Sequence, residues 1–176
     1  MPISPTTRWL LGALGALVAT AACAAPLTFA ISDLPAFSPA LVADEAGFFA
    51  AEGLDVKVIR CVNGRRCLQH LTDGEAALAT VADIPMVMAA HAGKPFGIVT
   101  TMATSRRETR LIVRSDRAIR SAADLKGKRL GVIRGTSAHY FADNFLTFSG
   151  MTHQDLTLVP LDPVRADEQL ISGEVD

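Results

Sequence analysis

The sequence predicts an α/β fold in which mainly parallel sheets are flanked by helices. Short runs rich in β-branched and aromatic residues alternate with helical stretches, and most of these stretches end at a glycine. Apolar residues make up 49% of the 176 residues and charged residues 20%, which is typical of a globular chain that can bury a core. Strands separated by helices form βαβ units, and such units build parallel sheets.

The charge balance excludes one class of partner. Lys plus Arg number 17 and Asp plus Glu number 18, so the formal net charge is −1. A nucleic-acid-binding domain needs a basic surface that neutralises phosphates, and one Trp and one Tyr offer little surface for base stacking. The sequence therefore indicates no nucleic-acid partner.

The N-terminus has the pattern of an export signal. Arg8 is the only charged side chain before an apolar run over residues 9–19, and small residues follow over 20–25. Ala22-Cys23-Ala24 fits an A-x-A cleavage site, with cleavage before Ala25. We therefore expect residues 1–24 to be a signal peptide that exports the chain.

Two alternatives to simple cleavage stay open. The apolar run could remain as an anchor helix, although it is short and rich in Ala and Gly. Cys23 could instead carry a lipid, although Thr20 stands three residues before it, where a lipoprotein site prefers an aliphatic residue.

Export changes the interpretation of the remaining cysteines, Cys61 and Cys67. In an oxidising compartment a turn at Asn63-Gly64 can bring the two sulfurs together. We predict a disulfide, with two free thiols as the alternative. Zinc is disfavoured because the spacing is not C-x-x-C and no paired His cluster accompanies it.

The first half of the mature chain alternates regularly between strands and helices. A Ser38 N-cap followed by Pro39 opens the first helix, and Gly53 ends it. The pattern predicts strands over residues 27–31, 55–60, 77–81 and 96–101, and helices over 39–52, around 68–71 and over 85–91.

A polar, basic segment over residues 104–108 has no periodicity and reads as a connection between two lobes. We place the first lobe at residues 25–104 and the second at 105–176. In the second, Phe141, Phe145 and Phe148 share one helix face, which favours core packing. The pattern there predicts strands over 111–114, 129–133 and 156–161, a capped turn over 121–128, and helices over 138–149 and 165–171.

A short internal parallel links the two lobes. Residues 71–77 and 170–176 both read as the end of a helix, a Gly and then a Glu. A strand follows in the first lobe, so by analogy we expect the second lobe to be incomplete, stopping in the middle of a unit.

Ligands of open parallel sheets lie at the carboxyl ends of the strands. The loops at those ends cover residues 32–38, 81–83, 102–104 and 135–138. The last is the sharpest candidate, because Gly135-Thr136-Ser137 joins a strand to a helix N-terminus, where free backbone N–H groups favour an anion.

The candidate ligand-binding side chains all come from these four loops. Each has an ordinary structural alternative: Phe37 could pack in the core, and Ser38, Asp83, Thr136 or Ser137 could cap a helix. The predicted set is Phe37, Ser38, Ala82, Asp83, Thr104, Gly135, Thr136 and Ser137.

Other polar residues point to no chemistry. The four histidines are dispersed without metal spacing, and no nucleophile, phosphate-loop or zinc-protease motif occurs. The pairs Arg65-Arg66 and Arg106-Arg107 read as solvated charges, with the alternative that one arginine of the second pair closes over an anion. The sequence therefore predicts no catalytic residues, no metal and no cofactor.

Five segments together resemble the periplasmic substrate-binding proteins of ABC importers for nitrate, sulfonates, taurine and thiamine-precursor pyrimidines. They are residues 43–56, 71–75, 122–132, 135–137 and 173–176. Their order and spacing resemble the family's along nearly all of the mature chain. The resemblance implies a type II periplasmic-binding-protein-like clamshell of two lobes that close on a small solute.

The resemblance also implies a function and partners. We expect a non-enzymatic, monomeric solute-binding protein that delivers a small anionic or heteroaromatic solute to a membrane permease. Two alternatives remain: an enzyme on the same scaffold, of the thiamine-pyrimidine synthesis type, and a sensor or remnant of a truncated gene.

Overall fold

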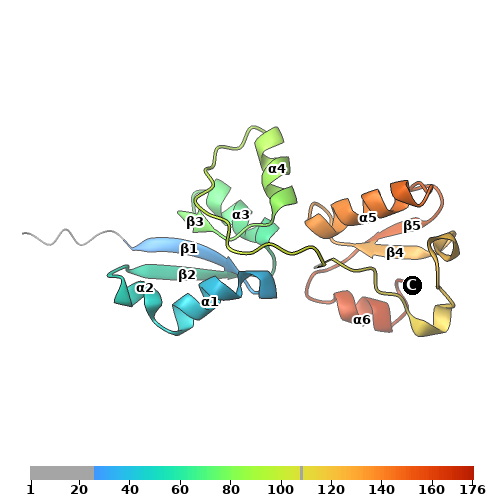
Figure 1. Ribbon diagram of the computed structural model, residues 1–176, viewed down its shortest axis with the longest axis horizontal. Coiled ribbons are helices and arrows are strands. Elements are labelled where there is room, and N and C mark those ends of the chain that lie inside the picture. The colour runs from blue at the N-terminus through green and yellow to red at the C-terminus, as the bar shows by residue number, and fades with distance from the viewer. Residues whose placement is uncertain (1–25, 108) are drawn as a thin grey trace, which may run out of the picture.

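The computed structural model describes residues 26–107 and 109–176, and its strands form two separate parallel sheets. The predicted signal peptide at 1–24, including Cys23, lies outside the described residues. We call the first sheet with α1–α4 the first lobe, and the second sheet with α5 and α6 the second lobe (Figure 1). The boundary expected at 104/105 stays a prediction.

The first lobe is built on a three-stranded sheet of order β2-β1-β3. The central strand β1 (Leu27–Ser32) pairs in parallel with β2 (Val56–Cys61) along its full length and with β3 (Leu78–Ala79) at two positions. A central strand carries the most buried positions, so Ala30, Ile31 and Ser32 are fully buried. The helices of this lobe are α1 (Ser38–Glu45), α2 (Phe48–Ala51), α3 (Gly64–Thr72) and α4 (Asp83–His91).

The predicted disulfide joins helix α3 to the end of β2 in this sheet. Cys61 at the end of β2 and Cys67 in α3 are bonded, with their Cα atoms 5.6 Å apart, which confirms the expected bridge. Both cysteines are buried beside Ala30 and Ala76, so the bridge is part of the small core of the lobe.

The second lobe is built on β4 (Arg129–Val132) and β5 (Thr157–Pro160), again a parallel pair. Helices α5 (Ser137–Phe148) and α6 (Ala166–Ile171) lie on opposite sides of it in Figure 1. The core contains seven buried apolar residues from β4, α5 and the connecting turns: Leu125, Leu130, Val132, Ala142, Leu146, Met151 and Leu156.

The buried face of α5 differs from the predicted phenylalanine line. Ala142 and Leu146 carry the contact with the sheet, while Phe148 is 88% exposed. Phe141 and Phe145 stack on each other with ring centroids 6.3 Å apart, and Phe145 is only partly buried against the core. The expected Phe face is therefore rotated toward the edge of the core.

The predicted helix over 39–52 is two helices. Gly47 adopts a left-handed conformation, with φ +73°, and separates α1 from α2. Ser38 is the first residue of α1 instead of its N-cap, and its side chain makes no capping hydrogen bond. Its N–H bonds the Pro35 carbonyl oxygen, which closes a preceding 3-10 turn.

Two expected strands, over residues 96–101 and 111–114, are not strands in the structure. Both segments are apolar, yet Val99 is 82% and Ile112 71% exposed. Strand propensity describes fit to a pleated, half-buried surface, and neither segment pairs with a strand in the described chain. Short 3-10 turns at Ser115–Arg117 and Ala122–Leu125 follow, and the second begins with the predicted cap, at Ser121.

The internal parallel between the lobes is confirmed in the backbone. Gly74 and Gly173 both have positive φ, of +78° and +79°, and each stands two residues after the last residue of its helix, α3 or α6. In each turn, two successive N–H groups after the glycine donate to one helix carbonyl, that of His70 or of Gln169. The same local sequence therefore builds the same helix end in both lobes.

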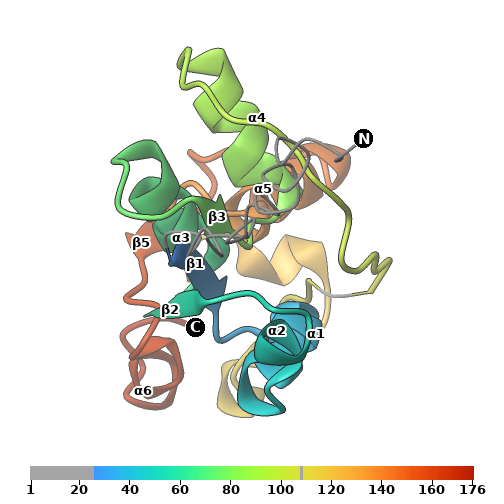
Figure 2. The same ribbon diagram turned by 90° about the vertical axis from the view of Figure 1, so that its left-hand side faces the viewer.

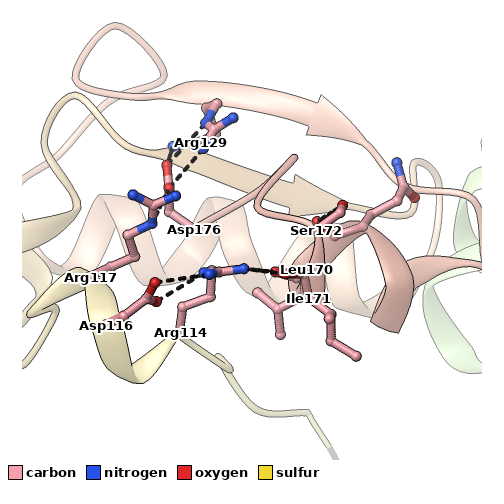
Figure 3. A network of polar contacts seen from close by, with 9 residues as sticks. Arg114, Asp116, Arg117, Arg129, Leu170, Ile171, Ser172 and Asp176 are labelled. Atoms are coloured by element: carbon pink, nitrogen blue, oxygen red, sulfur yellow. Dashed lines mark hydrogen bonds and ion pairs between the residues drawn. The ribbon is translucent and has the colours of Figure 1, made fainter.

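The second of these turns leads into an ion network that binds residues 114–117 to the second sheet (Figure 3). The Asp176 carboxylate accepts hydrogen bonds from the Arg129 backbone at 2.9 Å and from the Arg129 guanidinium at 2.9 and 3.1 Å. It also pairs with Arg117 at 3.2 Å. Arg114 joins the same region, because its guanidinium bonds the Leu170 carbonyl oxygen at 2.7 Å.

This network makes stability depend on pH. The Arg129 side chain, followed by its backbone N–H, lowers the pKa of Asp176 from 3.8 to about 2. A depressed carboxyl pKa contributes stability that is complete above 3.8 and is lost as the pH falls through about 2. We expect Asp176→Asn to reduce the slope of the free energy of unfolding against pH in that window. The reduction should correspond to at most about one bound proton per molecule.

Urea unfolding of both proteins between pH 2 and 5 measures this slope. Asp167→Asn, an exposed carboxylate in α6, is the control and should leave the slope unchanged. Equal slopes for Asp176→Asn and the original chain would contradict the role of the pair.

Candidate functional site

The two lobes meet where α4 and α5 begin. Ser137, the first residue of α5, donates its hydroxyl proton to Asp83 Oδ1 at 2.9 Å, and Asp83 is the first residue of α4. Both views place α4 next to α5 (Figure 1, Figure 2). Two of the predicted site residues, 54 positions apart in the sequence, are thus in direct contact across the lobes.

The loop before α5 is held by its own side chains. Thr136 is the N-cap: its Oγ1 accepts from the His139 N–H at 3.4 Å and donates to the Ile133 carbonyl oxygen at 2.7 Å. The capping alternative therefore applies to Thr136, whereas Ser137 reaches toward the other lobe. The Gly135 N–H donates to His139 Nδ1 at 3.3 Å, a contact that the sequence did not predict.

The loop before α4 lies directly against the start of α3. A Cβ placed on Gly64 would lie 3.1 Å from the Ala82 nitrogen and 3.2 Å from Val81 Cα, closer than a side chain is comfortably accommodated. Glycine at this position therefore allows the disulfide-closed segment to approach the loop that contains Ala82 and Asp83. The beginnings of three helices, α3, α4 and α5, are neighbours at this one place.

Arg65, the second residue of α3, is the main residue that the sequence analysis missed. A Cβ placed on Gly135 would lie 3.2 Å from Arg65 Cδ, so this side chain of the first lobe lies across the Gly135 loop of the second. The only sequence signal was a doubled arginine, which reads equally as a solvated surface. Arg65 is exposed, as the sequence analysis expected, but its side chain also contacts the Gly135 loop, which the sequence did not indicate.

The other predicted site residues lie apart from this contact. Phe37 is buried at the end of a 3-10 turn, Ser38 is exposed at the start of α1, and Thr104 is exposed in a segment without helix or strand. Within the described residues, none of the three side chains makes a hydrogen bond to Asp83 or Ser137. Their part in ligand binding stays a prediction.

The carboxyl ends of β1 and β3 are held together by a buried hydroxyl. The Ser32 N–H donates to Thr80 Oγ1 at 2.9 Å, and the Leu34 N–H donates to Ser32 Oγ at 3.3 Å. Asp33 pairs with Arg60 next to this end of the sheet. These contacts fix the loops that precede α1 and α4.

Residues 26–107 and 109–176 contain no group of three or more His, Cys, Asp or Glu placed to hold a metal ion. Across the same two ranges, no helix is long and apolar enough to cross a membrane.

The comparison with protein families decides the family. A family model described as NMT1/THI5 like matches residues 34–176. The chain belongs to the NMT1/THI5-like family. The match begins after β1 and includes the rest of both lobes, with all the residues that meet around Asp83 and Ser137.

Solved structures resemble this NMT1/THI5-like chain in fold. The alkanesulfonate-binding protein SsuA from Xanthomonas axonopodis pv. citri, bound to MOPS, has a TM-score of 0.73 at 28% identity, and the match covers 86% of this chain and 53% of that one. The periplasmic aliphatic sulphonate binding protein SsuA from Escherichia coli has a TM-score of 0.66 at 21% identity, with 86% and 49% covered, and shows the fold alone.

A similar sequence supports the same relationship. A Bacillus subtilis (strain 168) protein named for binding aliphatic sulfonates is 26% identical over 143 residues, which is 79% of this chain and 43% of the relative. The chain thus spans about half the length of the solved structures and less than half of this relative. The expected α/β fold with parallel sheets flanked by helices is confirmed.

The contact between Arg65 and Gly135 leads to a stability prediction. Gly135 has φ +72°, as does Gly127, but a Cβ on Gly127 would meet nothing within 4 Å. Gly127→Ala should lower the free energy of unfolding by about 1–2 kcal/mol for the left-handed backbone alone. Gly135→Ala should cost more, because the methyl group must also displace Arg65.

Thermal and urea unfolding of both variants measure the difference. Removing the obstacle in Gly135→Ala/Arg65→Ala should bring the cost back toward that of Gly127→Ala. Equal costs for the two single glycine variants would show that Arg65 does not lie on this loop in solution.

Proposed function

We propose that the chain is the solute-binding part of an ABC importer and that its solute lies between the two lobes, where α4 and α5 begin. The hydrogen bond from Ser137 to Asp83 carries the proposal, because it joins one lobe to the other at the carboxyl ends of parallel strands. Ligands of such sheets bind at those ends. The names of the relatives support binding without turnover as the activity.

The chemistry of this place suits an anion. The first N–H groups of α5 point out of the helix, the helix dipole adds positive potential, and the Ser137 hydroxyl can donate. Arg65 adds a full positive charge from the opposite lobe. Three of the predicted residues, Gly135, Thr136 and Ser137, supply the loop, and Ala82 and Asp83 supply the facing edge.

An aliphatic sulfonate is the solute that we propose first. Similar proteins are named for alkanesulfonate and aliphatic sulfonate binding, and a sulfonate has three acceptor oxygens for the donors around Ser137. The bound anion would replace Asp83 as the acceptor of the Ser137 hydroxyl proton. Nitrate and the thiamine-precursor pyrimidines are the competing solutes.

The cellular role follows from the same relatives. We propose export to the periplasm through residues 1–24, with residues 25–104 and 105–176 forming the two lobes. The chain would act as a monomer that closes on the solute and presents it to a membrane permease, without a cofactor.

Calorimetric titration of the chain tests the proposal. We expect one molecule of 1-butanesulfonate to bind per chain, and 1-butanol, which has the same alkyl group and no charge, to bind at least tenfold more weakly. Ser137→Ala should weaken sulfonate binding by roughly tenfold or more, because a hydrogen bond to a charged group contributes about 1.5–3 kcal/mol.

Ser172→Ala, which removes an exposed hydroxyl after α6, is the matched control and should leave affinity unchanged. Failure of every sulfonate to bind better than 1-butanol would contradict the proposed function. Sulfonate binding that Ser137→Ala does not weaken would contradict only the position of the site.

A further inference from the structure

Arg65 occupies an unusual position for a surface arginine. Its backbone belongs to α3 of the first lobe, but its side chain lies on Gly135 of the second, with Nη1 3.8 Å and Nε 3.9 Å from the position of a Cβ on that glycine. Its neighbour Arg66 is directed elsewhere, and its guanidinium donates to Gln69 within α3 at 3.0 Å. Two adjacent arginines therefore have different surroundings.

The charge of Arg65 also has no partner in the part of the chain that the structure describes. Across residues 26–107 and 109–176, its guanidinium makes no hydrogen bond or ion pair, whereas five other arginines are each paired with a carboxylate: Arg60, Arg114, Arg117, Arg129 and Arg165. A cation that lies beside the Gly135 loop without a carboxylate partner is available to an incoming anion. The contact with Gly135 places it next to the residue where α5 begins.

The segment that carries Arg65 is fixed at both ends. Cys61 and Cys67 enclose it in a disulfide loop, and these cysteines are 2% and 0% exposed. Within the loop, Asn63 caps α3 by accepting the Arg66 N–H on its side chain at 3.0 Å. Gly64, the residue before Arg65, lies against the backbone of Val81 and Ala82. The backbone of Arg65 thus has little freedom relative to the start of α4.

We propose that Arg65 is the cationic ligand of the anionic group of the solute, and that the Cys61–Cys67 bridge positions it. The inference rests on the proposed binding of an anion between the lobes. It adds to that proposal a binding residue, Arg65, and the disulfide that holds this residue in place. Arg65 would reach the anion from the first lobe while Ser137 and the first N–H groups of α5 reach it from the second. A guanidinium can donate two parallel hydrogen bonds to a sulfonate, which a lysine cannot do.

Titration calorimetry with 1-butanesulfonate at two salt concentrations tests this. Arg65→Ala should weaken binding by tenfold or more and reduce the salt dependence of Kd, because one charge pair is lost. Arg66→Ala removes the same charge one residue away and should change Kd by less than threefold. Arg65→Lys should recover part of the affinity.

The role of the bridge has its own readout. Cys61→Ala/Cys67→Ala should weaken sulfonate binding in the original chain, and should have little further effect when Arg65 is already Ala. A merely structural role would weaken both backgrounds equally. Circular dichroism at the titration temperature checks that each variant is folded, and the Arg65 and Arg66 variants retain the bridge.

The outcomes separate the two proposals. Sulfonate binding by the original chain with equal affinities for Arg65→Ala and Arg66→Ala would overturn the assignment of Arg65 and leave the proposed function intact. Equal loss in both cysteine backgrounds would overturn the positioning role of the bridge. Failure of the original chain to bind sulfonate would overturn the proposed function and this inference with it.

Discussion

Parallel strand pairing is the constraint on which the rest of the structure depends. It sends the carboxyl ends of β1, β2 and β3 to one edge of the first sheet and those of β4 and β5 to one edge of the second. In Figure 1 these two edges face each other. Because each strand is followed by a helix, the facing edges become facing helix N-termini, and Asp83 and Ser137 meet without any motif that links them in the sequence.

A second constraint is the close approach at Gly64. The start of α3 can lie against the β3–α4 loop only because position 64 has no Cβ, and the disulfide then holds the same segment to the end of β2. These two features bring Arg65 to the boundary between the lobes. If Arg65 binds the solute as we propose, the bridge connects the geometry of the site to the oxidising compartment that the N-terminal sequence predicts.

The sequence predicted the parts of the molecule that local patterns determine. The strands near 27–31, 55–60, 129–133 and 156–161, the disulfide and the two glycine-ended turns all follow from residues close together in the chain. The loops holding Asp83 and Ser137 were found because the parallel-sheet rule needs only the order of strands and helices. The apolar runs at 96–101 and 111–114 failed as predictions because pairing, unlike propensity, requires a partner distant in the sequence. Arg65 was missed for the same reason, since only the folded chain shows that Gly135 is its neighbour.

The same contacts explain how a carboxylate could belong to the anion site that we propose. In the structure the Ser137 hydroxyl donates to the Asp83 carboxylate. When an anion accepts from this hydroxyl instead, Asp83 loses that hydrogen bond. The Asp83 carboxylate would also repel a bound anion, because both are negatively charged. The helix N-termini alone would therefore stabilise the anion only weakly. Arg65 changes the balance because it adds a positive charge that no carboxylate of the described chain already neutralises. Selectivity would then depend on how well a solute satisfies Ser137 and Arg65 at once, which only a solute held by both lobes can do.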